Sequence, residues 1–375
     1  MQIYDQFEDG ETSYELDGVI RRESDFHDRY ASNVAAVEQV LRTLDTMAEQ
    51  VDPSAPWAAP RAAEWDQITV RQWYDSHGLD PVGTSLLEIC TIGILAVPLE
   101  EVSLLGLLAN VVTCGVTADL LSESEGGAQT QRFVGGTARI PGLLAAELGD
   151  RVVLEAPVQT IEHTADSVTV TCRGGEIARG RRVIVALAPT LAGRIMYDPP
   201  MPGLRDQLTQ RMPQASAMKM FAIYDEPFWR ADGLNGQLIS TLGPARMSND
   251  SGMPDGDQGI ILGFLEGPNA RVEGRWEIER RHEAFRTELA RHFGPRAARP
   301  ELIVEGEWSE RQWTRGCYNA NPGPGGWTHF GVALAEPVGA IHWAATETAD
   351  RWSGYMEGAL DAGERAARAV VESLG

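Results

Sequence analysis

Basic residues are scarce in this 375-residue chain, which has 32 Lys and Arg against 54 Asp and Glu and a formal net charge of −22. Nucleic-acid binding needs clustered Lys and Arg that displace counterions from phosphates. The composition therefore argues against a nucleic-acid partner. An acidic surface most often serves solubility, although it would also attract cationic substrates.

Cysteine is equally rare, with four widely separated residues: Cys90, Cys114, Cys172 and Cys317. No Cys-X-X-Cys motif occurs, and no His stands at metal-ligand spacing from a second His or Cys. We therefore expect no metal site. Isolated cysteines in apolar surroundings fit a reducing compartment, so the expected location is cytoplasmic.

Long apolar runs and an opening signal peptide are also absent. The two longest apolar stretches, 89–99 and 102–112, are separated by Glu100 and Glu101. Each is too short to span a bilayer, and we expect no membrane span. The length suggests two domains or one large interleaved domain.

Hydrophobic periodicity then predicts the elements. Period-two alternation from Arg151 to Pro189 predicts an antiparallel meander of short strands, and further strands are expected at 216–227, 259–267, 301–306 and 340–344. Helices are expected at 34–51, 70–78, 83–97, 101–114, 202–212, 277–294 and 354–373, with Thr69 capping the second. This order indicates an α/β fold of mixed α+β character.

The closing segment carries the first chemical signal. A strand and a polar loop lead to Ser353-Gly354-Tyr355 at the start of a helix. Ser353 is predicted to be the N-cap, which leaves the amides of Gly354, Tyr355 and Met356 free for a phosphate or an electron-rich ring edge. Alternatively, Gly354 and Gly358 allow close packing of the helix on a sheet. The residues alone leave both interpretations open.

The segment "HWAATETADRWSGYMEGALDAGERAA" resembles the C-terminal flavin-binding segment of the flavin monoamine oxidase family. The resemblance continues through nearly the whole chain, in "SAPWAAPRAAEWDQIT", "QRFVGGTARIPGLLAAELGDRVVLEAPVQTI", "SAMKMFAIYDEPFWR" and "TRGCYNANPGPGGWTHFG". It implies bound FAD and the oxidation of primary amines or polyamines to imines, with reduction of O2 to H2O2.

The resemblance also implies a cofactor site. Gly354, Tyr355 and Met356 match residues along the isoalloxazine ring, and Thr346 and Glu347 match the loop beside the cofactor. Val158 matches a strand that contacts the adenosine portion, and Trp308 matches a tryptophan near the reactive site, although it could be ordinary core. Cys317 falls where some members carry a thioether bond to the flavin. We favour non-covalent FAD over that bond, with Cys317 a buried free thiol.

Three residues match catalytic positions of the family. Lys219 matches the lysine that holds a water near the reactive flavin nitrogen; an unpaired ammonium among apolar neighbours would be costly, and a lysine that reaches solvent from an edge strand is the alternative. Tyr318 and Tyr355 match the paired rings that flank the amine, which ring faces attract as a cation. Weaker matches place Ile94, Leu121 and Gln129 in the substrate pocket.

The family's opening strand, G-X-G-X-X-G turn and helix are not found in the sequence. That unit holds the pyrophosphate on glycine amides and a helix start. The fold implied is therefore an incomplete Rossmann-like FAD domain (134–208 and 314–375) interleaved with a helix-plus-mixed-sheet substrate domain (1–133 and 209–313). We expect one face of the FAD domain to be open and the activity to be impaired.

Several alternatives stay open. The chain is interpreted as a truncated oxidase, as one subunit of a split oxidase whose partner chain supplies the missing unit, or as an inactive remnant. Within enzymes, an L-amino-acid oxidase or polyamine oxidase is the alternative, although no arginine can be assigned to a substrate carboxylate. The expected partners are a small-molecule amine and O2, with a homodimer as a further option.

Overall fold

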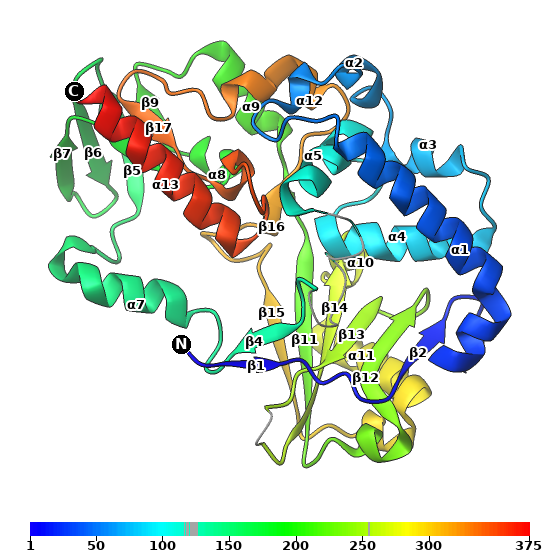
Figure 1. Ribbon diagram of the computed structural model, residues 1–375. Helices are drawn as coiled ribbons and strands as arrows, with labels where there is room; N and C mark the ends of the chain where they lie inside the picture. Colours follow the sequence, from blue (N-terminus) through cyan, green and yellow to red (C-terminus); the bar gives the residue numbers. More distant parts are fainter. Residues whose placement is uncertain (116, 118–119, 121–126, 254–255) are drawn as a thin grey trace.

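A seven-stranded mixed sheet is the central element of the computed structural model (Figure 1), which describes all residues except 116, 118–119, 121–126 and 254–255. The strands, in spatial order, are β15 (Leu302–Glu307), β11 (Ala217–Tyr224), β14 (Gly259–Glu266), β13 (Met247–Asp250), β12 (Leu234–Ser240), β2 (Glu11–Glu15) and β3 (Arg21–Arg22). The pair β12–β2 is parallel, and the other described pairs of this sheet are antiparallel.

The two faces of this sheet contact different helices. Met218 and Met220 of β11 belong to a buried cluster that includes side chains of α11 (Ile278–Phe293). Lys219 lies between them in sequence and therefore points to the other face. On that face lies α4 (Pro81–Leu95), so close that a Cβ atom on its Gly93 would overlap the side chain of Met247.

A helical layer packs beside the sheet. In Figure 1, α1 (Glu23–Ala48), α4 and α5 (Leu104–Cys114) gather together, and their apolar side chains form one buried cluster with Ala215 and Ala217. Thr69 caps α3 (Val70–Asp75) as predicted, because its side chain accepts a bond from the Gln72 amide. The short helices around this layer are α2 (Ala62–Trp65), α10 (Pro268–Glu273) and α12 (Gly326–Phe330).

The other half of the molecule contains smaller sheets. The strands β7 (Ile177–Gly180), β6 (Val168–Cys172), β5 (Val158–His163) and β9 (Met196–Asp198) form one sheet. The two-stranded sheets pair β8 (Val183–Val185) with β17 (Ile341–Trp343), β10 (Gln214–Ala215) with β16 (Cys317–Ala320), and β1 (Ile3–Asp5) with β4 (Gln131–Phe133). The helices of this half are α7 (Arg139–Leu148), α8 (Pro189–Ala192), α9 (Gly203–Arg211) and α13 (Met356–Ser373).

Several predicted elements need correction. The first helix starts at Glu23 rather than near residue 34, because its early turns bury only Phe26, which stacks on Tyr14 and gives no periodic signal. The meander holds for β5, β6 and β7, but β8 leaves it and pairs in parallel with β17. Residues 151–157, where the predicted meander begins, form no strand.

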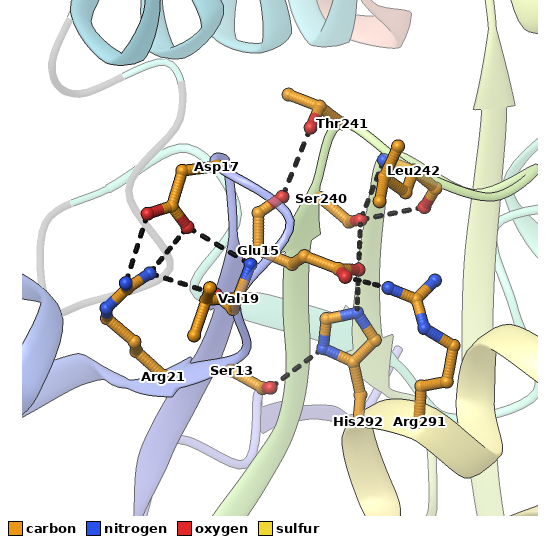
Figure 2. Close-up of polar contacts among 10 residues, drawn as sticks. All are labelled: Ser13, Glu15, Asp17, Val19, Arg21, Ser240, Thr241, Leu242, Arg291 and His292. Atoms are coloured by element: carbon orange, nitrogen blue, oxygen red, sulfur yellow. Dashed lines mark hydrogen bonds and ion pairs between the residues drawn. The ribbon is translucent and has the colours of Figure 1, made fainter.

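A buried polar cluster joins β2, β12 and α11 (Figure 2). His292 Nδ1 lies 2.7 Å from Ser13 Oγ, and its Nε2 lies 3.4 Å from Glu15 Oε2. Arg291 forms an ion pair with Glu15, to which Ser240 Oγ also donates a hydrogen bond at 3.2 Å. A serine, a histidine and a carboxylate would suit a hydrolase, but Ser13 is only 3% exposed. The cluster is therefore structural.

None of the helices in the described part of the chain has the length and apolarity needed to cross a bilayer. Across the same residues, His, Cys, Asp and Glu side chains form no group of three or more that could hold a metal ion.

Candidate active site

Lys219 lies in the middle of the face that α4 covers. Its register partners are Phe264 on β14 and Gly306 on β15, and its Nζ lies 5.1 Å from the centroid of the Phe264 ring. The side chain is half-buried, and burial lowers the pKa of Lys219, while the nearby Glu266 carboxyl opposes that shift. Lys219 is also the only lysine in the sequence. The sequence named this position by its match to the family's lysine, and its apolar neighbours supported the match.

Trp308 borders the same position. A Cβ atom on Gly306 would come within 2.7 Å of the indole ring, so the ring covers the backbone opposite Lys219. The half-buried indole and the Phe264 ring thus flank the lysine on its two neighbouring strands. The structure brings Trp308 and Lys219 together, while the role of Trp308 beside a cofactor remains a prediction.

Tyr318 approaches this face from β16. Its hydroxyl donates a hydrogen bond of 2.7 Å to Glu266 Oε1. Its backbone has φ 57°, a conformation that non-glycine residues rarely adopt and that persists only where surrounding contacts hold it. Burial, followed by the charge of Glu266, raises the pKa of Tyr318, so the phenol is neutral at pH 7.

Glu266 is a residue that the sequence analysis missed. It is 2% exposed, and it lies on the same face as Lys219 because its register partner is Ala217, two residues away on β11. Burial raises the pKa of Glu266 to about 8, against the opposing effects of the Tyr318 hydrogen bond and the Lys219 ammonium. The available signal was one acid inside the apolar strand "GIILGFLEG".

Tyr355 lies on a loop next to β16, the strand that carries Tyr318. A Cβ atom on Gly354 would lie 3.2 Å from Asn319 Nδ2, so this loop touches β16 beside both tyrosines. The Tyr355 phenol is also among the groups that raise the pKa of Tyr318, as expected for two side chains that lie near each other. Its own ring is half-buried and lies edge-on to Trp352, with centroids 5.3 Å apart.

The prediction of free amides before the last helix is wrong for Gly354 and Tyr355. The amide of Gly354 donates to Thr346 Oγ1 at 2.8 Å, and that of Tyr355 donates to the Trp352 carbonyl at 3.0 Å. The helix begins at Met356, and Tyr355, not Ser353, is its N-cap. The reason is the positive φ of Gly354, 89°, which turns the chain once more before the helix starts.

Gly358 allows close packing at the start of α13, as one of the two sequence interpretations proposed. A Cβ atom there would overlap the carbonyl oxygen of Trp352 and lie 2.8 Å from Thr346 Oγ1. Ala362 and Ala366 continue the same buried face of α13. At Gly358, the close approach of two backbone segments therefore accounts for the glycine.

Cys317 is a half-buried thiol beside the same strands. Its Sγ lies 3.9 Å from the carbonyl oxygens of Ala215 and Ala217. Burial, followed by the charge of Glu266, raises the pKa of Cys317 to about 12. The thiol is therefore protonated at neutral pH, which is the unreactive form.

Glu347 offers a polar contact to a ligand. Its Oε1 accepts a hydrogen bond of 2.7 Å from the Ala320 amide, while its buried Oε2 has no partner in the described structure. A cavity of about 30 Å³ borders Glu347, Asn110 and Ser353. Asn110 Oδ1 is also buried without a partner among the described residues. Buried acceptors of this kind need donors, and the ribityl hydroxyls of FAD would supply them, so these residues fit the cofactor.

The remaining predicted residues that the structure describes differ in their exposure. Val158 is 38% exposed on β5, and Met356 is 45% exposed at the start of α13. Ile94 is half-buried against the helical cluster, next to Gly93 of α4. Gln129 is exposed and donates to the carbonyl of Leu120 at 3.2 Å, and Leu121 lies outside the described residues.

Comparison with known proteins identifies the family. Residues 9–371 match the family described as "Flavin containing amine oxidoreductase". The probable flavin-containing monoamine oxidase A of Dictyostelium discoideum is 38% identical over 344 residues, which cover 91% of this chain and 75% of that protein. Flavin-containing amine oxidase B of Sus scrofa is 37% identical over 346 residues, covering 90% of this chain and 66% of that relative, just under two thirds of its length.

A solved structure gives the same answer for the fold. Cyclohexylamine oxidase from Brevibacterium oxydans IH-35A superposes with a TM-score of 0.91 at 31% identity, and the match covers 100% of this chain and 83% of that one. The mixed α/β architecture predicted from the sequence is therefore confirmed. The chain belongs to the family of flavin-containing amine oxidoreductases.

Proposed function

We propose that this chain acts in an FAD-dependent amine oxidase that converts primary amines to imines. The overall reaction takes R–CH2–NH2 and O2 to R–CH=NH and H2O2, so the two electrons and two protons lost by the amine appear in peroxide. The observation that carries the proposal is the meeting of Lys219, Tyr318 and Tyr355 at one junction, in a chain of this family.

FAD, when bound, would supply the electron acceptor for the amine and the donor for O2. Thr346 and Glu347 would hold it together with the Gly354–Tyr355 turn, and Val158 and Met356 would contact it farther from the reacting atoms. The segments 134–208 and 314–375 are proposed as its domain, with 1–133 and 209–313 on the substrate side. We propose non-covalent binding, since the protonated thiol of Cys317 is in its unreactive form.

The side chains of the site would position the amine and control solvent. The rings of Tyr318 and Tyr355 would flank the nitrogen, which favours one approach direction and attracts a cation to the ring faces. Lys219 would hold a water through its ammonium group. Phe264 and Trp308, which flank Lys219, make the surroundings apolar and favour a monoamine with an apolar substituent.

The experiment measures peroxide release from the FAD-supplemented protein with benzylamine, putrescine and leucine side by side. Benzylamine is expected to give the highest rate; a preference for putrescine or leucine would select the polyamine or amino-acid alternative. Lys219→Met is expected to slow flavin reoxidation by at least about tenfold, whereas Lys219→Arg keeps the cation and serves as the matched control. Acid precipitation of the same protein is expected to release the flavin into solution.

Two results would contradict the proposal. Background peroxide with all three substrates would exclude an amine oxidase acting on these classes. Wild-type turnover in Lys219→Met would remove Lys219 from the site while leaving the oxidase assignment in place.

A further inference from the structure

Glu266 combines three features at the candidate active site. It is the last residue of β14, two positions after Phe264, and it lies on the sheet face that carries Lys219. Its Oε1 accepts the Tyr318 hydroxyl at 2.7 Å, and its Oε2 is buried with no hydrogen-bond partner in the described residues. A buried polar atom without a partner is costly, so its retention calls for an explanation.

We propose that Glu266 is a positioning residue of the active site, which fixes the phenol end of Tyr318 and sets the charge of Lys219 across the same sheet face. The inference rests on the proposed function, because Tyr318 and Lys219 act on substrate only if the chain oxidises amines. Glu266 lies outside the motifs that carry the family resemblance.

The first part of the argument concerns Tyr318. Its φ of 57° is unfavourable for a residue with a side chain, so other contacts must hold the ring in place. The bond to Glu266 restrains the ring at the end opposite the backbone. A phenol–carboxyl bond in a buried site has little competition from water and is correspondingly strong. The ring that is expected to flank the amine is therefore fixed at both ends.

The second part concerns charge. Glu266 and Lys219 form no ion pair in the described structure, yet each affects the other: Glu266 opposes the lowering of the Lys219 pKa, and Lys219 opposes the raising of the Glu266 pKa. Above about pH 8, where Glu266 is ionised, the opposite charges on this buried face stabilise each other. Removal of the carboxyl group would leave the ammonium with one fewer favourable neighbour.

The groups that face this pair come from several elements. Tyr318 and Cys317 approach from β16, and Arg132 on β4 acts on Lys219 in the direction opposite to Glu266. From α4, Gly93 presents no side chain, and a Cβ atom there would lie 3.8 Å from Glu266 Oε2. Glu307, the last residue of β15, acts on Cys317. Glu266 is the carboxyl group that acts on Lys219, so the charge at Lys219 is expected to respond to Glu266.

Three variants separate the two roles. Glu266→Gln keeps an acceptor oxygen for Tyr318 but removes the charge. Glu266→Leu removes both. Glu288→Gln is the matched control, because Glu288 is also buried with one unpartnered carboxyl oxygen in the described structure, but it lies on α11 and accepts a bond from the Ala245 amide.

The charge role can be tested without turnover. Because Lys219 is the only lysine, reductive methylation with ¹³C-formaldehyde labels one side chain besides the terminal amine, and NMR titration of that signal reports its pKa. The pKa of Lys219 is expected to fall in Glu266→Gln and in Glu266→Leu, and to be unchanged in Glu288→Gln. An unchanged value in all three variants would overturn the charge role.

The positioning role is tested in the FAD-supplemented enzyme with benzylamine. Glu266→Leu and Tyr318→Phe are each expected to lower kcat by about 10- to 100-fold, and the double variant is expected to lose no more than either alone. Glu266→Gln is expected to lower kcat by about threefold, less than Glu266→Leu, because the acceptor remains while the charge is lost. Additive losses, or wild-type kcat in Glu266→Leu, would overturn the positioning role. If wild type oxidises no amine, the proposed function fails, and the titration alone decides the link between Glu266 and Lys219.

Discussion

The two halves of the molecule differ in how much of their apolar surface is covered. Around the seven-stranded sheet, α1, α4, α5 and α11 bury their apolar side chains in clusters that continue from element to element. In the other half, α7 has no buried residue, and its leucines, Leu143, Leu144 and Leu148, are exposed. The exposed face of α13 likewise carries Met356, Leu360 and Val371.

This difference indicates where stability resides. Each Å² of apolar surface removed from water contributes roughly 25 cal/mol, so the sheet and its helices supply most of the free energy of folding. The half with α7 and α13 is expected to open first. The candidate active site lies at the boundary between the two halves, where β11 and β14 of the first half meet the loops that precede α13.

The sharpest test compares Phe285→Ala with Leu144→Ala. Phe285, on α11, is 0% exposed and its ring packs against Gly263 of β14, whereas Leu144 is 48% exposed on α7. The first change should lower the free energy of unfolding by about 3–5 kcal/mol, because it leaves a cavity. The second should change it by less than about 0.5 kcal/mol. Urea unfolding measures both values, and equal losses would remove the difference between the halves.

The buried cluster in Figure 2 gives a pH-dependent test within the covered half. Burial, followed by the charge of Arg291, lowers the pKa of His292 to about 4 from its usual 6.5. The unfolded chain therefore binds a proton below pH 6.5 that the folded chain excludes down to about pH 4. The free energy of unfolding is therefore highest above pH 6.5. It falls as the pH drops from 6.5 to about 4, by up to about 3 kcal/mol from this group.

His292→Gln lacks that titration. Its unfolding free energy should be lower than wild type at pH 7, and the gap should narrow by up to about 3 kcal/mol on acidification to pH 4. Chemical denaturation at both pH values measures the gap. A gap that stays constant would show that His292 does not titrate in this window.

The smallest expected effect concerns Thr346, in the loop that precedes α13. Thr346 Oγ1 accepts from the Gly354 amide and donates to the Tyr355 carbonyl at 3.1 Å. Thr346→Val removes both bonds and should lower the unfolding free energy by about 1–2 kcal/mol, with weaker FAD binding in a fluorescence titration. Thr346→Ser keeps the hydroxyl and should bind FAD as wild type does. Identical binding by the valine and serine variants would show that the loop needs no such restraint.

Local patterns predicted the elements whose environment is local. The alternation in "AMKMFAIY" fixed the two faces of β11, and the Thr69 side chain indicated a helix start that the structure confirms. The strand β2 was missed because Thr12, Ser13 and Glu15 are buried polar residues. Their partners, such as Gln237, Ser240 and His292, come more than 200 residues later, so no local pattern reveals them.

The candidate site shows the same limit. Lys219, Trp308, Tyr318 and Tyr355 were named from their matches to family motifs, and the structure brings them to one junction. Glu266 was missed because its importance depends on Tyr318, which lies 52 positions later. The helix cap at Ser353 was wrong because Thr346 takes the Gly354 amide, a contact that depends on how the preceding loop folds.

The parallel pairing of β2 with β12 has a consequence during synthesis. Glu15 is synthesised 225 residues before its register partner Ser240. At about 5–20 residues per second, the strand waits on the order of ten to forty seconds before its neighbour exists. The other edge of β2 pairs with β3, which follows directly in the chain. Throughout that interval the edge that β12 later occupies is open to any other edge strand, so β2 is a segment that a holding chaperone would protect.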